Sequence, residues 1–141
     1  MAFYDRLPKL KGELEQLGHE VFIPSLEFES IKSDTSGDGS IDGNGGIDAF
    51  PPNHEFWINK GKAIKAHFEK INEHDCILVT NYEKRGVPNY IGGNAFMEMG
   101  YAFGNGKKIF VLNELPKNSA NIEEMMGMQP VVLGGDITKI K

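Results

Sequence analysis

The sequence has little cysteine and no long apolar run, and these two absences limit the cellular environments in which we expect the protein. Cys76 is the only cysteine among 141 residues, which excludes an internal disulfide and leads us to expect a reducing, cytoplasmic environment. No apolar stretch approaches the roughly 20 residues that a membrane-spanning helix needs, and we see no signal-peptide core. We therefore expect a protein without a membrane partner.

Positive charge is also scarce. The chain has 15 basic and 20 acidic residues, for a net charge of −5 at pH 7. Duplex nucleic acid is bound largely by neutralising phosphates, so we expect no nucleic-acid partner. The histidines and the cysteine show no zinc-ligand spacing, and we predict neither a structural metal nor a cofactor.

Most of the composition is typical of one small globular domain, which we predict over residues 1–141. The exception is a Gly/Asp-rich insertion at about 26–52. Residues 26–50 contain six acidic residues and one lysine, a surplus equal to the net charge of the whole chain. A connection of this length has a function of its own or lacks regular structure; a lid over a binding crevice is the functional interpretation.

Within the insertion, Asp34-Thr-Ser-Gly-Asp-Gly-Ser-Ile-Asp42 is similar to the start of a calcium-binding loop. The similarity fails at the twelfth position, where Gly45 stands in place of a bidentate glutamate. A metal-dependent interaction protein built on this segment is one hypothesis. A Gly/Asp-rich connection without a metal is the interpretation that we prefer.

Short apolar runs separated by helical patterns indicate the fold. The runs are continuous rather than alternating, as in parallel strands covered on both faces by helices. The sequence therefore predicts an α/β protein with a three-layer, flavodoxin-like parallel sheet. We expect helices at 3–17, 54–73, 94–104 and near 119–126, and strands at 20–24, 76–80, 108–112 and 130–133.

One carboxylate stands out in the segment between the second and third predicted strands. Glu98 lies in the first turns of the helix predicted to begin near Asn94, at the end of the sheet where open α/β folds bind ligands. On a helical period it shares a side with two alanines, a face that can approach the sheet closely. A glutamate favoured only by the helix dipole is the structural alternative.

The turn before this helix supplies further candidates for ligand contact. Tyr90 and Asn94 flank it, and Gly92 and Gly93 let backbone N–H groups approach a sugar or phosphate at the helix N-terminus. By itself a Gly-Gly pair is weak evidence. Trp57 and the histidines fit structural roles better, with an aromatic lid over a base as the alternative for Trp57.

Four segments together resemble the nucleoside 2-deoxyribosyltransferase superfamily, which includes the 2′-deoxynucleoside 5′-monophosphate N-glycosidases. They are Asp75-Cys-Ile-Leu-Val-Thr-Asn81, Tyr90-Ile-Gly-Gly-Asn94, Glu98-Met-Gly-Tyr-Ala102 and Lys107-Lys-Ile-Phe-Val-Leu112. The resemblance covers roughly residues 1–135 in element order, and its specific part is 75–112. Each segment is short, but their order and spacing agree with the family.

The resemblance implies roles for individual residues. Glu98 matches the family's nucleophile, and Asp75 matches an acidic residue that helps to position the sugar and base. Tyr90, Gly92, Gly93, Asn94 and Asn81 are the expected substrate-binding residues. Our own strand assignment puts Asp75 at the entry of its strand, the wrong end for the crevice, so the two arguments conflict there.

The beginning of the chain departs from the family pattern. The family opens with a strand and a Gly-Ser-type loop, whereas this sequence starts in the predicted first helix with the stripe Tyr4, Leu7, Leu10, Leu14 and Leu17. In a flavodoxin-like order the missing strand would be an interior one. We expect either an internal start within a longer product or a rearranged sheet.

The leading hypothesis is an enzyme that cleaves or transfers at the N-glycosidic bond of 2′-deoxynucleosides or their 5′-monophosphates, through a covalent deoxyribosyl-Glu98 intermediate. The alternative is a non-catalytic nucleoside- or nucleotide-binding module. In both cases the partner is a small molecule. The resemblance further implies a homo-oligomer.

Overall fold

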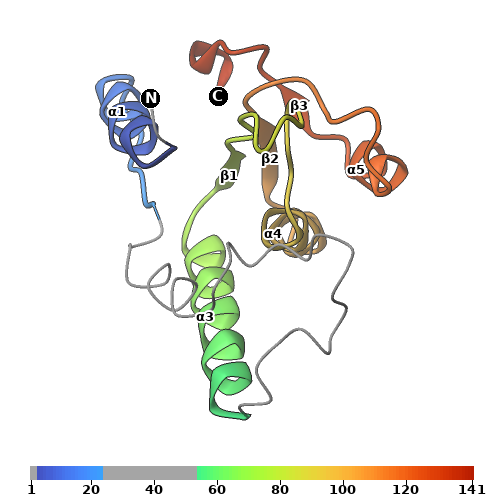
Figure 1. The fold of residues 1–141 in the computed structure, drawn as a ribbon. Coiled ribbons are helices and arrows are strands. Elements are labelled where there is room, and N and C mark those ends of the chain that lie inside the picture. The colour runs from blue at the N-terminus through green and yellow to red at the C-terminus, as the bar shows by residue number, and fades with distance from the viewer. Residues whose placement is uncertain (1–2, 24–53) are drawn as a thin grey trace. The chain divides into compact units, whose positions relative to one another are not determined.

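The structure is a computed structural model that describes residues 3–23 and 54–141, with side chains from Arg6 onward. By its internal contacts the chain divides into two compact units: Met1–Phe22 with Phe68–Lys141, and Ile23–His67. The elements are α1 (Phe3–Gln16), α3 (His54–Glu73), β1 (Cys76–Val79), α4 (Gly93–Gly104), β2 (Lys108–Val111), α5 (Ile122–Gly127), β3 (Val131–Val132) and the 3₁₀ helix η2 (Ile137–Lys139) (Figure 1).

The strands form one parallel sheet in the order β1-β2-β3. Cys76 of β1 is opposite Lys108 of β2, and Phe110 of β2 is opposite Val131 of β3. The helices α4 and α5 lie between successive strands along the chain, as the crossovers between parallel strands require. The predicted α/β fold class is confirmed, and the order agrees with the last three strands of a flavodoxin-like sheet.

The core lies mainly on one face of this sheet. Because side chains alternate along a strand, Ile109 and Val111 point to the same face, where Met99 and Ala102 of α4 are fully buried. The opposite face of β2 is buried too, through Phe110. Burial on both faces is the physical reason for the uninterrupted apolar runs in the sequence. The core cluster is Ile71, Val79, Met99, Ala102, Ile109, Val111 and Met125.

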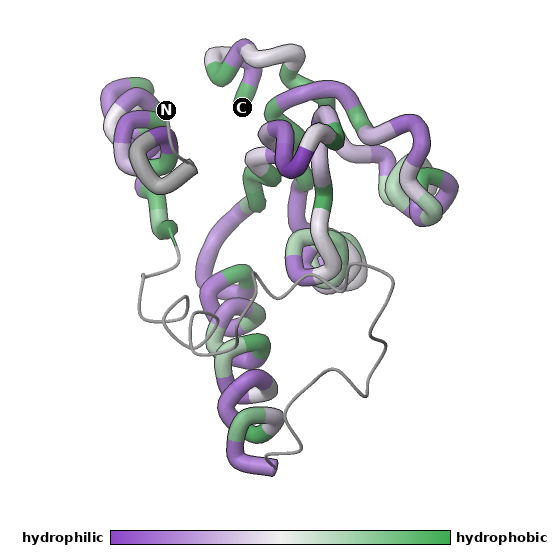
Figure 2. The backbone as a smooth tube through the Cα atoms, in the orientation of Figure 1, coloured by the Kyte–Doolittle hydropathy of each residue, from purple (hydrophilic) through white to green (hydrophobic). Residues whose placement is uncertain are grey.

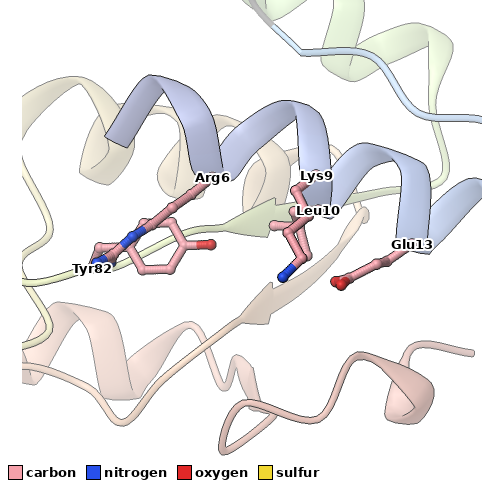
Figure 3. A pocket seen from close by; sticks show the side chains of 5 residues that line it. All are labelled: Arg6, Lys9, Leu10, Glu13 and Tyr82. Carbon is pink, nitrogen blue, oxygen red and sulfur yellow. The ribbon is translucent and has the colours of Figure 1, made fainter. Parts of the chain in front are cut away.

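The first helix is amphipathic, as its sequence predicts. Leu10 and Leu14, one turn apart, are buried, while Leu17 at the end of the stripe is 46% exposed. In Figure 3, α1 passes over the strands with Leu10 directed inward. Gly18 ends the helix with a positive φ of 94°, a conformation that other residues adopt only with strain.

Helix α4 begins and ends through backbone interactions. At its start the Phe96 N–H donates to the carbonyl of Gly92, the N-cap, at 2.9 Å. At its end Gly106 has a φ of 71°, and the Lys107 N–H donates back to the carbonyl of Ala102 at 2.9 Å. The predicted boundaries, 94–104, are therefore correct to one residue.

The prediction of a strand at 20–24 is wrong for residues 20–23, the part of it that the structure describes. In the described ranges, residues 20–23 are in no strand and pair with none of β1, β2 and β3. A parallel strand needs a hydrogen-bonded neighbour, and an apolar run such as Val21-Phe-Ile23 cannot supply one by itself. Phe22 instead lies near the His74 ring, with 6.3 Å between ring centroids. Pro24, the predicted insertion at about 26–52 and its calcium-like segment lie outside the described residues.

Helix α3 alternates polar and apolar residues along its length (Figure 2). The boundary between the two units falls within it, after His67. On the side of the sheet unit, Phe68 stacks on Tyr101 of α4, with ring centroids 4.1 Å apart. In the other unit, Phe56 and Trp57 meet edge to face at 4.8 Å. Among the described residues, no helix is both long enough and apolar enough to cross a membrane.

Cys76, the single cysteine of the chain, is the first residue of β1, and its thiol is partly buried. Burial, and then the nearby charge of Asp75, raise the pKa of Cys76 above 9.0. A raised pKa leaves less thiolate near neutral pH, and the thiolate is the reactive form. We predict that native Cys76 reacts with iodoacetamide at pH 8 several-fold more slowly than the same chain in 6 M guanidinium chloride.

The pH dependence supplies a second check on this prediction. Alkylation of the native protein should continue to accelerate at pH values above 9.0, where the thiol of the unfolded chain is already largely ionised. Equal native and denatured rates at pH 8, measured by intact-mass spectrometry, would show that the thiol is neither shielded nor shifted.

Candidate functional site

The edge of the sheet at which its strands end, here called the carboxyl edge, is the natural place for a ligand. Strand β1 ends at Val79, and residues 80–92 lead from it into α4. Two contacts put the other end of α4 beside Asn72, before β1 begins: the side chains of Asn72 and Tyr101 are hydrogen-bonded at 2.9 Å, and Lys107 Nζ donates to the Asn72 carbonyl at 3.2 Å. Helix α4 therefore begins at the carboxyl edge.

Glu98 is half-buried on α4 and is the only charged residue of that helix. Its neighbours Met99 and Ala102 are fully buried against the sheet. It is the sixth helical residue, so its Cα lies roughly 8 Å along the axis from the first. Side chains on a helix lean toward its N-terminus, which shortens the distance from the carboxylate to the carboxyl edge.

The turn before α4 brings together four of the predicted substrate-binding residues. Tyr90 and Gly92 precede the helix, Gly93 is its first residue and Asn94 its second. A Cβ added to Gly92 would lie 3.2 Å from Cε1 of Tyr90, so glycine permits this close packing. The Tyr90 N–H donates to the carbonyl of Tyr82 at 3.2 Å, which ties the turn to the segment directly after β1.

Asn81, the remaining predicted ligand contact, joins the ends of β1 and β2. It is 1% exposed. Its Nδ2 donates to the carbonyls of Asn113 at 3.2 Å and Glu114 at 2.9 Å, and its Oδ1 accepts from the Asn113 N–H at 2.8 Å. Asn113 Nδ2 donates in return to the Asn81 carbonyl at 3.3 Å. The Asn81 amide is thus engaged on both its donor and acceptor sides in holding the carboxyl edge together.

Asp75 lies apart from these residues. It is exposed and immediately precedes β1, at the edge of the sheet opposite the start of α4. The charge of Asp75 acts on the adjacent Cys76 thiol, whose pKa it helps to raise. The structure thus groups Tyr90, Gly92, Gly93 and Asn94 in one turn and puts Asp75 elsewhere.

A hollow of about 200 Å³ lies between α1 and the segment after β1. We call it the α1 hollow; Figure 3 shows the side chains that line it: Arg6, Lys9, Leu10, Glu13 and Tyr82. The Arg6 guanidinium carbon is 4.9 Å from the centroid of the Tyr82 ring, a cation–π contact. Because Tyr82 follows Asn81, the hollow lies at the carboxyl edge.

The charges of the α1 hollow act on Tyr82. Burial raises the pKa of its phenol above 10.0, Arg6 opposes that rise, and Glu13 adds to it. The phenol is therefore neutral at physiological pH and can donate a hydrogen bond. The sequence analysis does not identify Arg6 or Tyr82 as candidate site residues. The only sequence signal that could have pointed to Tyr82 is its position just after Asn81, near the end of a buried strand.

No group of three or more His, Cys, Asp and Glu side chains that could hold an ion occurs within residues 3–23 and 54–141. The chain matches no protein-family model, no curated protein and no solved structure.

The Asn81 amide generates a stability prediction. In Asn81→Ala three side-chain hydrogen bonds are lost in a buried place, and we expect the free energy of unfolding to fall by about 2–4 kcal/mol. Urea denaturation followed by circular dichroism measures the change. The matched control is Asn105→Ala, which removes an exposed bond from Nδ2 to the Tyr101 carbonyl and should cost less than about 1 kcal/mol. Equal losses for the two variants would contradict the role given to Asn81.

Proposed function

We propose that this protein cleaves or transfers at the N-glycosidic bond of 2′-deoxynucleosides or their 5′-monophosphates, with Glu98 as the nucleophile. One observation carries the proposal: α4, which bears Glu98 as its only charged residue, begins at the carboxyl edge of a parallel sheet. The sequence resemblance to the nucleoside 2-deoxyribosyltransferase superfamily supplies the reaction class.

The proposed reaction has two steps. The Glu98 carboxylate attacks C1′ of the sugar, the bond from C1′ to the base nitrogen breaks, and the base leaves with the bonding electron pair. The resulting ester between sugar and enzyme is then opened at C1′ by water or by a second base, which frees Glu98 with net retention. An ionised carboxylate also stabilises the oxocarbenium character of both transition states.

The turn residues have binding roles in this proposal. Gly92 and Gly93 leave their backbone N–H groups accessible to sugar or phosphate oxygens at the start of α4. The Tyr90 ring packs over Gly92 and offers a face for the sugar or base. Asn94 contributes an amide nearby. The resemblance gives Asn81 a binding role as well, but its buried amide is engaged with residues 113 and 114, so it supports the site by holding the carboxyl edge together. For Asp75, only the resemblance to the family supports a role in positioning the sugar and base.

The resemblance and the composition support two further parts of the proposal. The protein acts in the cytoplasm, as its lone cysteine suggests, and it assembles as a homo-oligomer. Apolar side chains on the exposed side of α4 fit an assembly, because Met97 is 38% and Phe103 is 53% exposed.

A nucleoside- or nucleotide-binding module without turnover is the second candidate. The placement of Asp75 favours it: a carboxylate at the opposite edge from the start of α4 does not assist chemistry there. This candidate keeps the ligand class and dispenses with the covalent step.

Glu98→Ala separates the two candidates. We predict that the native protein releases or exchanges base from 2′-deoxynucleosides or their 5′-monophosphates, and that the variant loses at least about 10³-fold in kcat because the nucleophile is gone. Chromatography of the products, with and without an acceptor base, measures both outcomes. Glu123→Ala, an exposed carboxylate on α5, is the matched control and should retain activity.

Two results would count against the glycosidic mechanism. Turnover that survives in Glu98→Ala would remove Glu98 from the chemistry. Saturable nucleotide binding by folded native protein, without product on any substrate of the panel, would favour the binding module.

A further inference from the structure

Strand β1 is an edge of the sheet without the features that usually protect such edges. Within the described ranges it pairs with β2 alone. An open edge presents unpaired backbone N–H and C=O groups, which soluble proteins shield with charges, proline, a bulge or a very short strand. The segment Cys76-Ile-Leu-Val79 has no charge and no proline, and its register with β2 is uninterrupted. The opposite edge strand, β3, has only two residues and follows Pro130, so it is protected.

The hydrogen bonds to β2 identify the backbone groups that face the open side of β1. The Leu112 N–H donates to the carbonyl of Val79 at 3.0 Å, so Val79 directs its backbone to β2. In a parallel ladder, alternate residues of a strand direct both of their backbone groups to the same neighbour. Ile77 therefore bonds to β2 as well, whereas the N–H and C=O groups of Cys76 and Leu78 point to the open side.

The side chains of β1 are as apolar as those of an interior strand but are less buried. In β2, the three residues Ile109, Phe110 and Val111 are at most 4% exposed. In β1, Val79 is buried and the three residues before it are only partly buried. A continuous apolar run is typical of a strand inside a sheet. A further strand along this edge would both pair the outward backbone groups and cover the partly exposed side chains.

The charges at the two ends of β1 favour a second copy of the chain in antiparallel orientation. The exposed carboxylate of Asp75 immediately precedes the strand, while Arg6 lies beside Tyr82, just beyond its other end. Of the charged residues that line the α1 hollow there, Arg6 and Lys9 are cations and Glu13 is an anion. Antiparallel pairing brings Asp75 of each copy toward the cations of the other, whereas parallel pairing would bring the two Asp75 carboxylates together.

We propose that β1 pairs with β1 of a second copy in antiparallel orientation, which joins two three-stranded sheets into one continuous sheet across a two-fold axis. This interface rests on the homo-oligomer of the proposed function and does not depend on chemistry at Glu98. It differs from an assembly through the exposed apolar residues of α4, Met97 and Phe103. Four residues from each copy make a small contact, so the association should depend on concentration.

Amide hydrogen exchange of the full chain, resolved by NMR and repeated from micromolar to near-millimolar concentration, tests the pairing. Analytical ultracentrifugation at the same concentrations measures the fraction of dimer. We expect the Leu78 N–H to exchange at least about tenfold more slowly as the dimer forms, because it gains a carbonyl partner. Ile77 and Val79 are internal controls, since their N–H groups bond to β2 with or without a partner.

Two variants distinguish the edge of β1 from the exposed side of α4. Leu78→Pro removes the outward N–H without removing a hydrogen bond to β2, and it should abolish the dimer. Met97→Lys puts a charge on the exposed apolar side of α4 and should leave the dimer intact.

An exchange of charges tests the antiparallel orientation. Asp75→Lys and Arg6→Glu should each weaken the dimer about tenfold, because the two-fold axis repeats each change, and the double variant should recover most of the native affinity. The matched control is Glu123→Lys, the same change of charge on an exposed residue of α5, which should dimerise as the native protein does.

Four outcomes would overturn this interface. A chain that stays monomeric with a rapidly exchanging Leu78 amide would leave the edge to a different partner. A monomer with a protected Leu78 amide would show that one chain covers its own edge. A dimer lost in Met97→Lys but retained in Leu78→Pro would move the interface to α4. A double charge variant no tighter than the single ones would exclude the antiparallel orientation.

Thermal denaturation shows whether each variant is folded, and the charge exchange decides if Leu78→Pro is not. The Glu98→Ala protein should dimerise as the native protein does. Loss of the glycosidic reaction and loss of this interface are therefore separable.

Discussion

The carboxyl edge depends on one buried amide. Asn81 lies two residues after β1, and its side chain bonds one donor and two acceptors of the residues that follow β2, so it ties the exits of the two strands together. A buried donor or acceptor that loses its hydrogen-bond partner lowers the stability of the fold, so few other arrangements of these two strand ends are compatible with it. The segment that leads to α4 leaves from this exit and is tied back to it, because the Tyr90 N–H donates to the carbonyl of Tyr82, the residue after Asn81.

Around this edge the charged groups are divided between elements. Helix α4 supplies a single carboxylate in an otherwise uncharged sequence, while α1 supplies both the cations and the carboxylate of the α1 hollow, Arg6, Lys9 and Glu13. Lys11 and Glu15 make an (i, i+4) ion pair on α1, whereas the Arg6 guanidinium carbon lies 4.9 Å from the centroid of the Tyr82 ring.

Much of the fold was predictable because its signals are local. Continuous apolar runs located β1, β2 and β3, and Gly106 located the end of α4 because a left-handed residue stops a helix wherever it occurs. The run at 20–23 misled because strand formation also needs a neighbour, which sequence does not show. The roles of Asn81 and of the Arg6–Tyr82 contact are equally non-local. Glu98, by contrast, was identified by its place in the first turns of the helix after β1 and by the two alanines on its face, both of which are local features of the sequence; it is half-buried.

The division into two compact units has a spectroscopic consequence. The only tryptophan, Trp57, belongs to the unit of residues 23–67, and it is 40% exposed. All four tyrosines, Tyr4, Tyr82, Tyr90 and Tyr101, belong to the unit that holds the sheet. Fluorescence excited at wavelengths that only tryptophan absorbs therefore reports on the unit of residues 23–67. The tyrosine signal that remains after the tryptophan contribution is subtracted reports on the unit that holds the sheet. The native chain carries its own pair of probes, with no label needed to follow the two units separately.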